Sequence, residues 1–195
     1  MKTENIILMK MARESLKDRW GLAIGTFAVY ILIVGILQSF SLGRIASVVI
    51  TGPLMLGVSI FSLSLSRNQE ARIEQLFEGF DHFLLTLKTY LLMILFIVLW
   101  LLLLIVPGII AAISYSLTFY ILADDKTLKP KEALEKSKKM MEGNKWKMFC
   151  LGLRFIGWFL LSILTLGIGL LWLIPYAQVS VAKFYDDIKD NKQRN

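Results

Sequence analysis

FLLTLKTYLLMILFIVLWLLLLIVPGIIAAISYSLTFYIL, residues 83–122, is an apolar stretch that carries one charge, at Lys88. It is too long for one membrane crossing, because a helix of about 20 residues already crosses a hydrocarbon core of roughly 30 Å. Val106-Pro107-Gly108 interrupts the stretch, and proline next to glycine is typical of a break between helices. The stretch therefore predicts a hairpin of two membrane-spanning helices over residues 83–105 and 108–123.

Apolar runs of the same kind lie on both sides of this hairpin. They predict spans over residues 20–40, 45–65, 149–164 and 168–185, with turns at Ser41–Arg44 and Thr165–Gly169 and a proline kink at Pro53. With 56% hydrophobic residues and a mean hydropathy of +0.62, the chain is too apolar for a soluble domain. We therefore predict a single all-α, polytopic membrane domain over residues 1–195, with six transmembrane helices arranged as three hairpins.

The distribution of charge predicts the orientation of these hairpins. Of the 22 Lys and Arg residues, only Arg44 falls in an external turn, and none of the 15 Asp and Glu residues does. Short cytoplasmic loops retain Lys and Arg during insertion. If residues 149–185 formed one long span, the basic tail after Lys183 would lie outside, whereas six spans return it to the cytoplasm. We therefore expect a multi-pass plasma-membrane protein with both termini in the cytoplasm.

Two segments between spans, residues 67–80 and 130–143, have the apolar spacing of amphipathic helices that lie at the cytoplasmic membrane interface. Glu and Lys residues occupy their polar faces. These faces can dock on each other, the lysines can bind anionic headgroups or a partner, or both faces can simply be solvated. The residues concerned are Glu70, Glu74 and Glu78 on the acidic side and Lys131, Lys138, Lys139, Lys145 and Lys147 on the basic side.

Few polar groups are predicted to lie within the spans. Lys88 and Arg154 lie near span ends, where they can snorkel to the headgroup layer or contact a lipid phosphate. Two polar bands, in spans four and six, can line a cavity or hydrogen-bond between helices. They comprise Ser114, Ser116, Thr118 and Tyr120 with the adjacent Tyr115, and Tyr176, Gln178 and Ser180.

The residues that catalysis and metal binding usually require are scarce. His82 is the only histidine and Cys150 the only cysteine, which excludes the common zinc motifs and an intramolecular disulfide. No carboxylate lies within a predicted span, which weakens the case for a proton- or sodium-coupled transporter. The net charge of +7 spreads over the cytoplasmic segments, as topology requires, so it does not indicate nucleic-acid binding. We expect no enzyme activity, no cofactor and no metal.

Four segments carry a resemblance to a known family: IEQLFEGF (73–80), PGIIAAISYSLTFYILAD (107–124), EALEKSKKMMEGNKWKMFCL (132–151) and LTLGIGLLWLIPY (164–176). The chain resembles the bacterial integral membrane family called domain of unknown function 975. More distantly, it is similar to the membrane domain attached to some glycerophosphodiester phosphodiesterases, although it has no room for their catalytic barrel. The first resemblance implies a bacterial membrane, and neither implies functional residues.

Two functions remain open on the sequence. The first is a non-enzymatic scaffold, accessory or lipid-interacting subunit whose partners are membrane lipids and a membrane protein or further copies of itself. The alternative is a small oligomeric permease or channel with a path lined by spans four and six. A hydrated cavity that reaches Ser116 and Gln178 would favour the permease.

Overall fold

The computed structural model describes residues 3–39 and 43–193, and all regular structure within them is helical. The all-α prediction is thus confirmed for this part of the chain. Five helical stretches in it are long and apolar enough to cross a membrane: Trp20–Gln38, Ala46–Ser66, Ile73–Leu103, Ile105–Asp124 and Lys145–Leu164. These stretches indicate a membrane protein, and the count of six spans stays a prediction.

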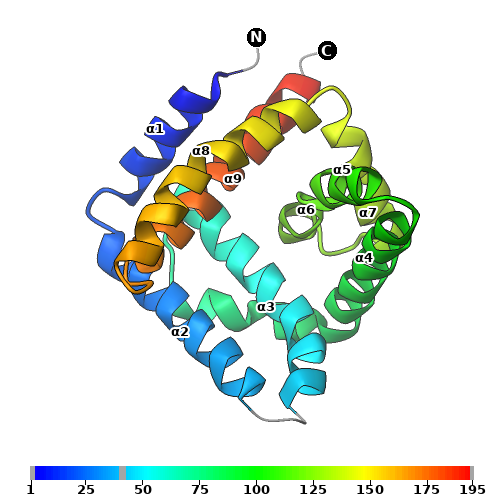
Figure 1. Cartoon of the computed structure of the whole chain (residues 1–195), viewed down its shortest axis with the longest axis horizontal. Helices are drawn as coiled ribbons and strands as arrows, with labels where there is room; N and C mark the ends of the chain where they lie inside the picture. Colours follow the sequence, from blue (N-terminus) through cyan, green and yellow to red (C-terminus); the bar gives the residue numbers. More distant parts are fainter. Residues whose placement is uncertain (1–2, 40–42, 194–195) are drawn as a thin grey trace. The chain divides into compact units, whose positions relative to one another are not determined.

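The helices follow one another with short connections (Figure 1). In chain order they are α1 (Asn5–Leu16), α2 (Trp20–Gln38), α3 (Gly43–Ser66), the 3-10 helix η1 (Ile73–His82), α4 (Phe83–Leu103), α5 (Ile105–Tyr115), α6 (Thr118–Asp124), α7 (Pro130–Met141), α8 (Lys145–Leu164) and α9 (Leu170–Gln193). Of the predicted turn at Ser41–Arg44, residues 41 and 42 lie outside the described residues, whereas Gly43 and Arg44 are the first residues of α3. The predicted turn at Thr165–Gly169 is confirmed, with Leu166 and Gly167 at positive φ.

The helices of the described chain form two compact units. Unit 1 comprises residues 3–33, 61–73 and 146–193, and unit 2 comprises residues 34–60 and 74–145 without residues 40–42. Helices α2 and α3 contribute residues to both units, and the single membrane domain stays a prediction.

In unit 1, α1 is a helix that our sequence analysis missed. Leu8, Ala12 and Leu16 recur every fourth residue and are buried, with at most 1% of each residue exposed. This spacing puts them on one side of a helix. That side packs along α9, which lies beside α1 and α8 (Figure 1). The charged N-terminal segment is therefore a packed part of unit 1.

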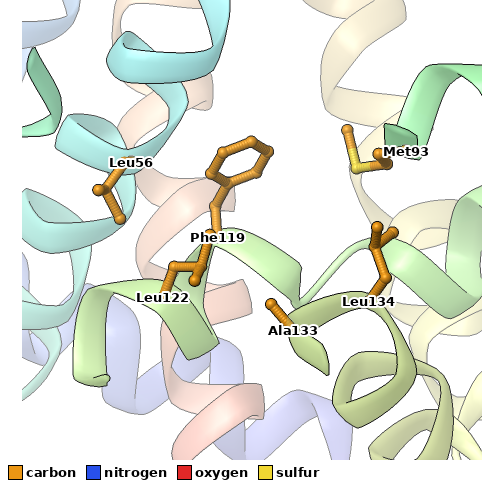
Figure 2. Packing of buried hydrophobic residues seen from close by; sticks show 6 residues of the cluster. All are labelled: Leu56, Met93, Phe119, Leu122, Ala133 and Leu134. Atoms are coloured by element: carbon orange, nitrogen blue, oxygen red, sulfur yellow. The ribbon is translucent and has the colours of Figure 1, made fainter. Parts of the chain in front are cut away.

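In unit 2, α7 packs against α4, α5 and α6. Its predicted apolar edge, Ala133, Leu134, Met140 and Met141, is buried, and Pro130 begins the helix as predicted. Figure 2 shows Ala133 and Leu134 near residues from three other helices. The packed residues are Leu56 of α3, Met93 of α4, and Phe119 and Leu122 of α6. The helix thus exposes its lysines and buries its apolar edge within the protein.

The acidic segment predicted as an amphipathic helix over residues 67–80 is a 3-10 helix that starts only at Ile73. Its apolar residues do not share one environment, because Leu76 is buried while Ile73 and Phe77 are exposed. Two glycines set its close contact with α3: a Cβ on Gly57 would lie 2.0 Å from the Leu76 carbonyl oxygen, and a Cβ on Gly79 would lie 2.0 Å from that of Pro53. Any side chain at these two positions would clash with the facing backbone, so the glycines allow η1 to lie directly against α3.

Predicted span four is two helices, α5 and α6, with Ser116 and Leu117 between them. The preceding break lies at Leu104, earlier than predicted, because Pro107 fits the first turn of a helix. Where α5 ends, backbone carbonyls lose their intrahelical donors. The buried Ser137 hydroxyl of α7 donates a 2.8 Å hydrogen bond to the Ser114 carbonyl. A neighbouring helix thus stabilises the break.

The last two helices are longer than predicted. Helix α8 begins at Lys145 rather than at residue 149, and α9 continues to Gln193 rather than ending at residue 185. Apolar composition marks only the part of a helix that suits a membrane, whereas the helix itself continues through charged residues. The polar end of α9 also keeps it out of the five candidate spans.

Candidate functional site

The polar end of α9 holds a buried ion pair in unit 1. The Asp187 carboxylate lies 2.7 Å from the Lys147 ammonium of α8, and these side chains are only 9% and 17% exposed. Thr3 donates to the same carboxylate from its hydroxyl at 2.5 Å and from its backbone amide at 3.3 Å. Burial opposes ionisation of Asp187, but the hydrogen bonds from Lys147 and Thr3 outweigh it and lower the pKa of the carboxyl below its ordinary value.

The next carboxylate, Asp186, binds the end of α3. Arg67 lies 2.7 Å from it, and the Ser66 hydroxyl donates to it at 3.3 Å. The Ser66 carbonyl in turn accepts hydrogen bonds from Ser15 of α1 and from the Lys183 ammonium. The end of α9 therefore joins the end of α3 and the start of α8 through ion pairs, and the N-terminal segment through hydrogen bonds from Thr3.

A groove of about 580 Å³ lies in unit 1 between α1, α8 and α9. Most of its wall is apolar or aromatic, and its volume is typical of a small-molecule site. Trp158 and Trp172 are 58% and 49% exposed, so their rings stand at the open side. The groove is lined by Met9, Arg13, Trp20, Trp158, Leu161, Ser162, Thr165, Gly169, Trp172, Leu173 and Tyr176.

The rim of the groove on α1 is basic. A second hollow, of about 460 Å³, shares Arg13 and Trp20 with the groove and is also lined by Lys10, Glu14 and Lys17. Lys10 and Arg13 are three residues apart on one face of α1, and Lys17 caps the end of this helix and lines the same hollow. An apolar groove with a cationic, aromatic rim can take an amphiphile whose polar end is negative.

The hydroxyls of the polar bands predicted in spans four and six largely form hydrogen bonds within their own spans. The hydroxyls of Ser114, Ser116, Thr118 and Ser180 each donate to a carbonyl three or four residues earlier, at 2.7 to 2.8 Å. Of the predicted cavity residues, Tyr176 lines the groove described above. Spans four and six belong to different units.

The charged residues of the two predicted amphipathic surfaces differ in their partners and in their exposure. In unit 2, the cation that lies 3.8 Å from Glu78 is Lys126, which was not among the predicted lysines. Lys131 lies 3.9 Å from Glu135 of its own helix. Lys147 is the partner of Asp187. The remaining predicted cations Lys88, Lys138, Lys139 and Arg154 are exposed, as is Glu74, and Lys145 is half-buried.

Comparison with known proteins identifies the family. A family model described as "Protein of unknown function (DUF975)" matches residues 1–117 and 101–192. The chain belongs to this family. No curated protein and no solved structure matches the chain, so the more distant resemblance to phosphodiesterase membrane domains gains no support. The family carries no described function.

The groove of this DUF975 protein and its basic rim were not predicted from the sequence. The spacing of Lys10, Arg13 and Lys17 is visible in the sequence, and so is the opposite stripe of Leu8, Ala12 and Leu16. Together they would have indicated an amphipathic α1. The approach of α8 and α9 to that helix depends on contacts between distant residues and has no local signal.

Proposed function

We propose that this protein is a non-enzymatic, lipid-interacting membrane protein that acts as a scaffold or accessory subunit in a bacterial plasma membrane. The groove of unit 1 is the main observation that supports this proposal. Its walls are apolar, its open side bears two exposed tryptophans, and tryptophan prefers the boundary between hydrocarbon and headgroups. Such a groove suits a lipid molecule at the membrane interface.

Six spans with both chain ends on the same side of the membrane remain our proposed topology. The groove, which Thr165 and Gly169 of the α8–α9 turn also line, lies at the opposite end of that hairpin from the Lys147–Asp187 pair. Within unit 1, the pair between Lys147 and Asp187 joins the start of α8 to the end of α9. Two consecutive helices form a hairpin when the start of the first lies beside the end of the second. Six spans require this arrangement of α8 and α9. Thr3 contacts the same carboxylate, which supports placing both chain ends on one side.

A permease path through spans four and six has weaker support. The hydroxyls in these spans bond to carbonyls of their own helices, so they offer few free groups to a passing solute. Cysteine accessibility at Ser116 and Gln178 tests this alternative. Labelling of both positions from the aqueous phase in intact membranes would favour the permease.

Lipid retention tests the proposal directly. The protein is purified in a mild detergent, and native mass spectrometry records the lipids that remain bound. We expect Trp158→Ala combined with Trp172→Ala to reduce retained lipid several-fold, because these rings border the groove. Trp100→Ala is the matched control, since Trp100 is 45% exposed on α4 in unit 2 and is not among the residues that line the groove.

Two results would oppose the proposal. Wild-type protein without retained lipid would remove its basis, as would equal losses in the double variant and in Trp100→Ala. The same spectra report a co-purified protein, which would support the scaffold role.

A further inference from the structure

We infer that the groove of unit 1 binds an anionic phospholipid, and that its phosphate is held by Lys10 and Arg13 of α1 and by Lys17, the residue that caps the end of this helix. This inference deepens the proposed function and rests on it. It names the ligand class and places its polar end at the rim shared by the groove and the neighbouring hollow.

The positive charge of the rim favours an anionic ligand. Lys10 and Arg13 share one helix face, where like charges at this spacing repel one another, and Lys17 caps the end of the same helix. Within residues 3–39 and 43–193, none of the three forms an ion pair, and Glu14 is the only acidic residue that lines either hollow. A net positive rim of this kind is complementary to a phosphate group.

The apolar wall of the groove favours a lipid over a free anion. Leu161, Trp172 and Leu173 line the groove, and α8 continues from it as an exposed apolar surface that includes Leu160 and Leu164. About 580 Å³ accommodates the glycerol region and the first part of the acyl chains. The remaining chain length can follow the exposed face of α8.

The apolar groove and the basic hollow have two lining residues in common. Arg13 and Trp20 line both the apolar groove and the basic hollow, so a phosphate beside Arg13 lies next to aromatic and apolar surface. Arginine offers five donors in a fixed geometry that matches phosphate oxygens. Arg13 is therefore the central headgroup ligand, and Lys10 and Lys17 add electrostatic attraction.

Binding to lipids of defined charge tests the inference. Detergent-solubilised protein is titrated with phosphatidylglycerol or phosphatidylcholine of identical acyl chains, and bound lipid is counted by native mass spectrometry. We expect Arg13→Gln to weaken phosphatidylglycerol binding about fivefold or more and to leave phosphatidylcholine unchanged. Adding Lys10→Gln and Lys17→Gln should remove the preference.

The control variants separate charge from folding. Glu14→Gln removes a negative charge from the same rim and should strengthen phosphatidylglycerol binding, whereas a merely damaged helix would weaken it. Arg13→Lys should restore most of the preference. Lys138→Gln alters an exposed lysine of α7 in unit 2 and should have no effect.

The outcomes distinguish this inference from the proposed function. Equal binding of the two lipids, both reduced by the tryptophan double variant, would overturn the anionic headgroup and leave the lipid groove intact. Binding of neither lipid would overturn both. A loss of phosphatidylglycerol binding in Lys138→Gln but not in Arg13→Gln would move the anionic site to α7.

Discussion

Replacement of Asp187 by asparagine tests the packing of unit 1 most directly. The substitution keeps the size of the side chain and removes its charge. The neighbouring Lys147 ammonium, at 17% exposure, then loses the carboxylate that lies 2.7 Å away. Thr3, which donates twice to this carboxylate, loses a charged acceptor.

The structure gives the expected size of the effect. Breaking a fully buried pair costs about 3–5 kcal/mol, and exposed pairs contribute about 0–1 kcal/mol. Lys147 and Asp187 lie near the buried limit, and asparagine retains one acceptor oxygen, so we expect a loss of roughly 2–4 kcal/mol. Asp186→Asn is the matched control, because its pair with Arg67 is 24% to 29% exposed and should contribute about 1 kcal/mol.

Thermal and urea unfolding in detergent, followed by circular dichroism, measures both variants. A double-mutant cycle with Lys147→Met isolates the energy of the pair, which we expect to exceed about 1 kcal/mol. Equal losses in Asp187→Asn and Asp186→Asn, or a cycle energy near zero, would refute the reasoning.

The pH dependence gives an independent check with a fixed sign. Because the pKa of Asp187 is lowered in the folded protein, its stabilisation is complete above the ordinary carboxyl pKa of about 3.9 and is lost as pH falls through the folded value. The stability difference between wild type and Asp187→Asn should therefore shrink in acid. A difference that stays constant down to the acid limit of folding would contradict a charged Asp187.

Three further predictions concern unit 2 and its contacts. Gly57→Ala should lose about 2–3 kcal/mol of stability in thermal unfolding, because its Cβ would meet the Leu76 carbonyl, whereas Gly25→Ala, with open space around it, should stay within about 1 kcal/mol of wild type; equal effects would contradict the close contact. Ser137→Ala should cost about 1–2 kcal/mol in urea unfolding by leaving the Ser114 carbonyl without its donor, and no loss would show that another donor replaces it. Charge reversal at Glu74 and Glu78 should lower the melting temperature by the equivalent of about 1 kcal/mol or less, and the loss should vanish at high salt; a larger, salt-independent loss would indicate tight docking of the acidic face.

Several features of the fold were predictable because their causes are local. The apolar runs predicted the helices, and Pro130 and the glycine turn before α9 predicted helix boundaries. The apolar edge of α7 was predictable from spacing alone, since a helix brings every third and fourth residue to one side. These features require only the residues within one segment.

Other features depended on distant residues and could not be predicted. The close approach of η1 to α3 depends on Gly57 and Gly79, which face the backbone of another segment, and the break at Ser116 is stabilised by Ser137 from another helix. The lysine that pairs with Asp187 was assigned to lipid or a partner, because neither residue shows its neighbour in the sequence.

The sequence by itself determined that the chain is helical, apolar enough for a membrane and poor in catalytic groups, because composition and spacing are properties of short segments. Only the tertiary structure decided which charges pair and where a groove forms. Lys147 and Asp187 meet, and Arg13 lines one groove with Trp158 and Trp172, because α1, α8 and α9 pack together. The energies that select such contacts come from burial and pairing across the folded unit, and no local pattern records them.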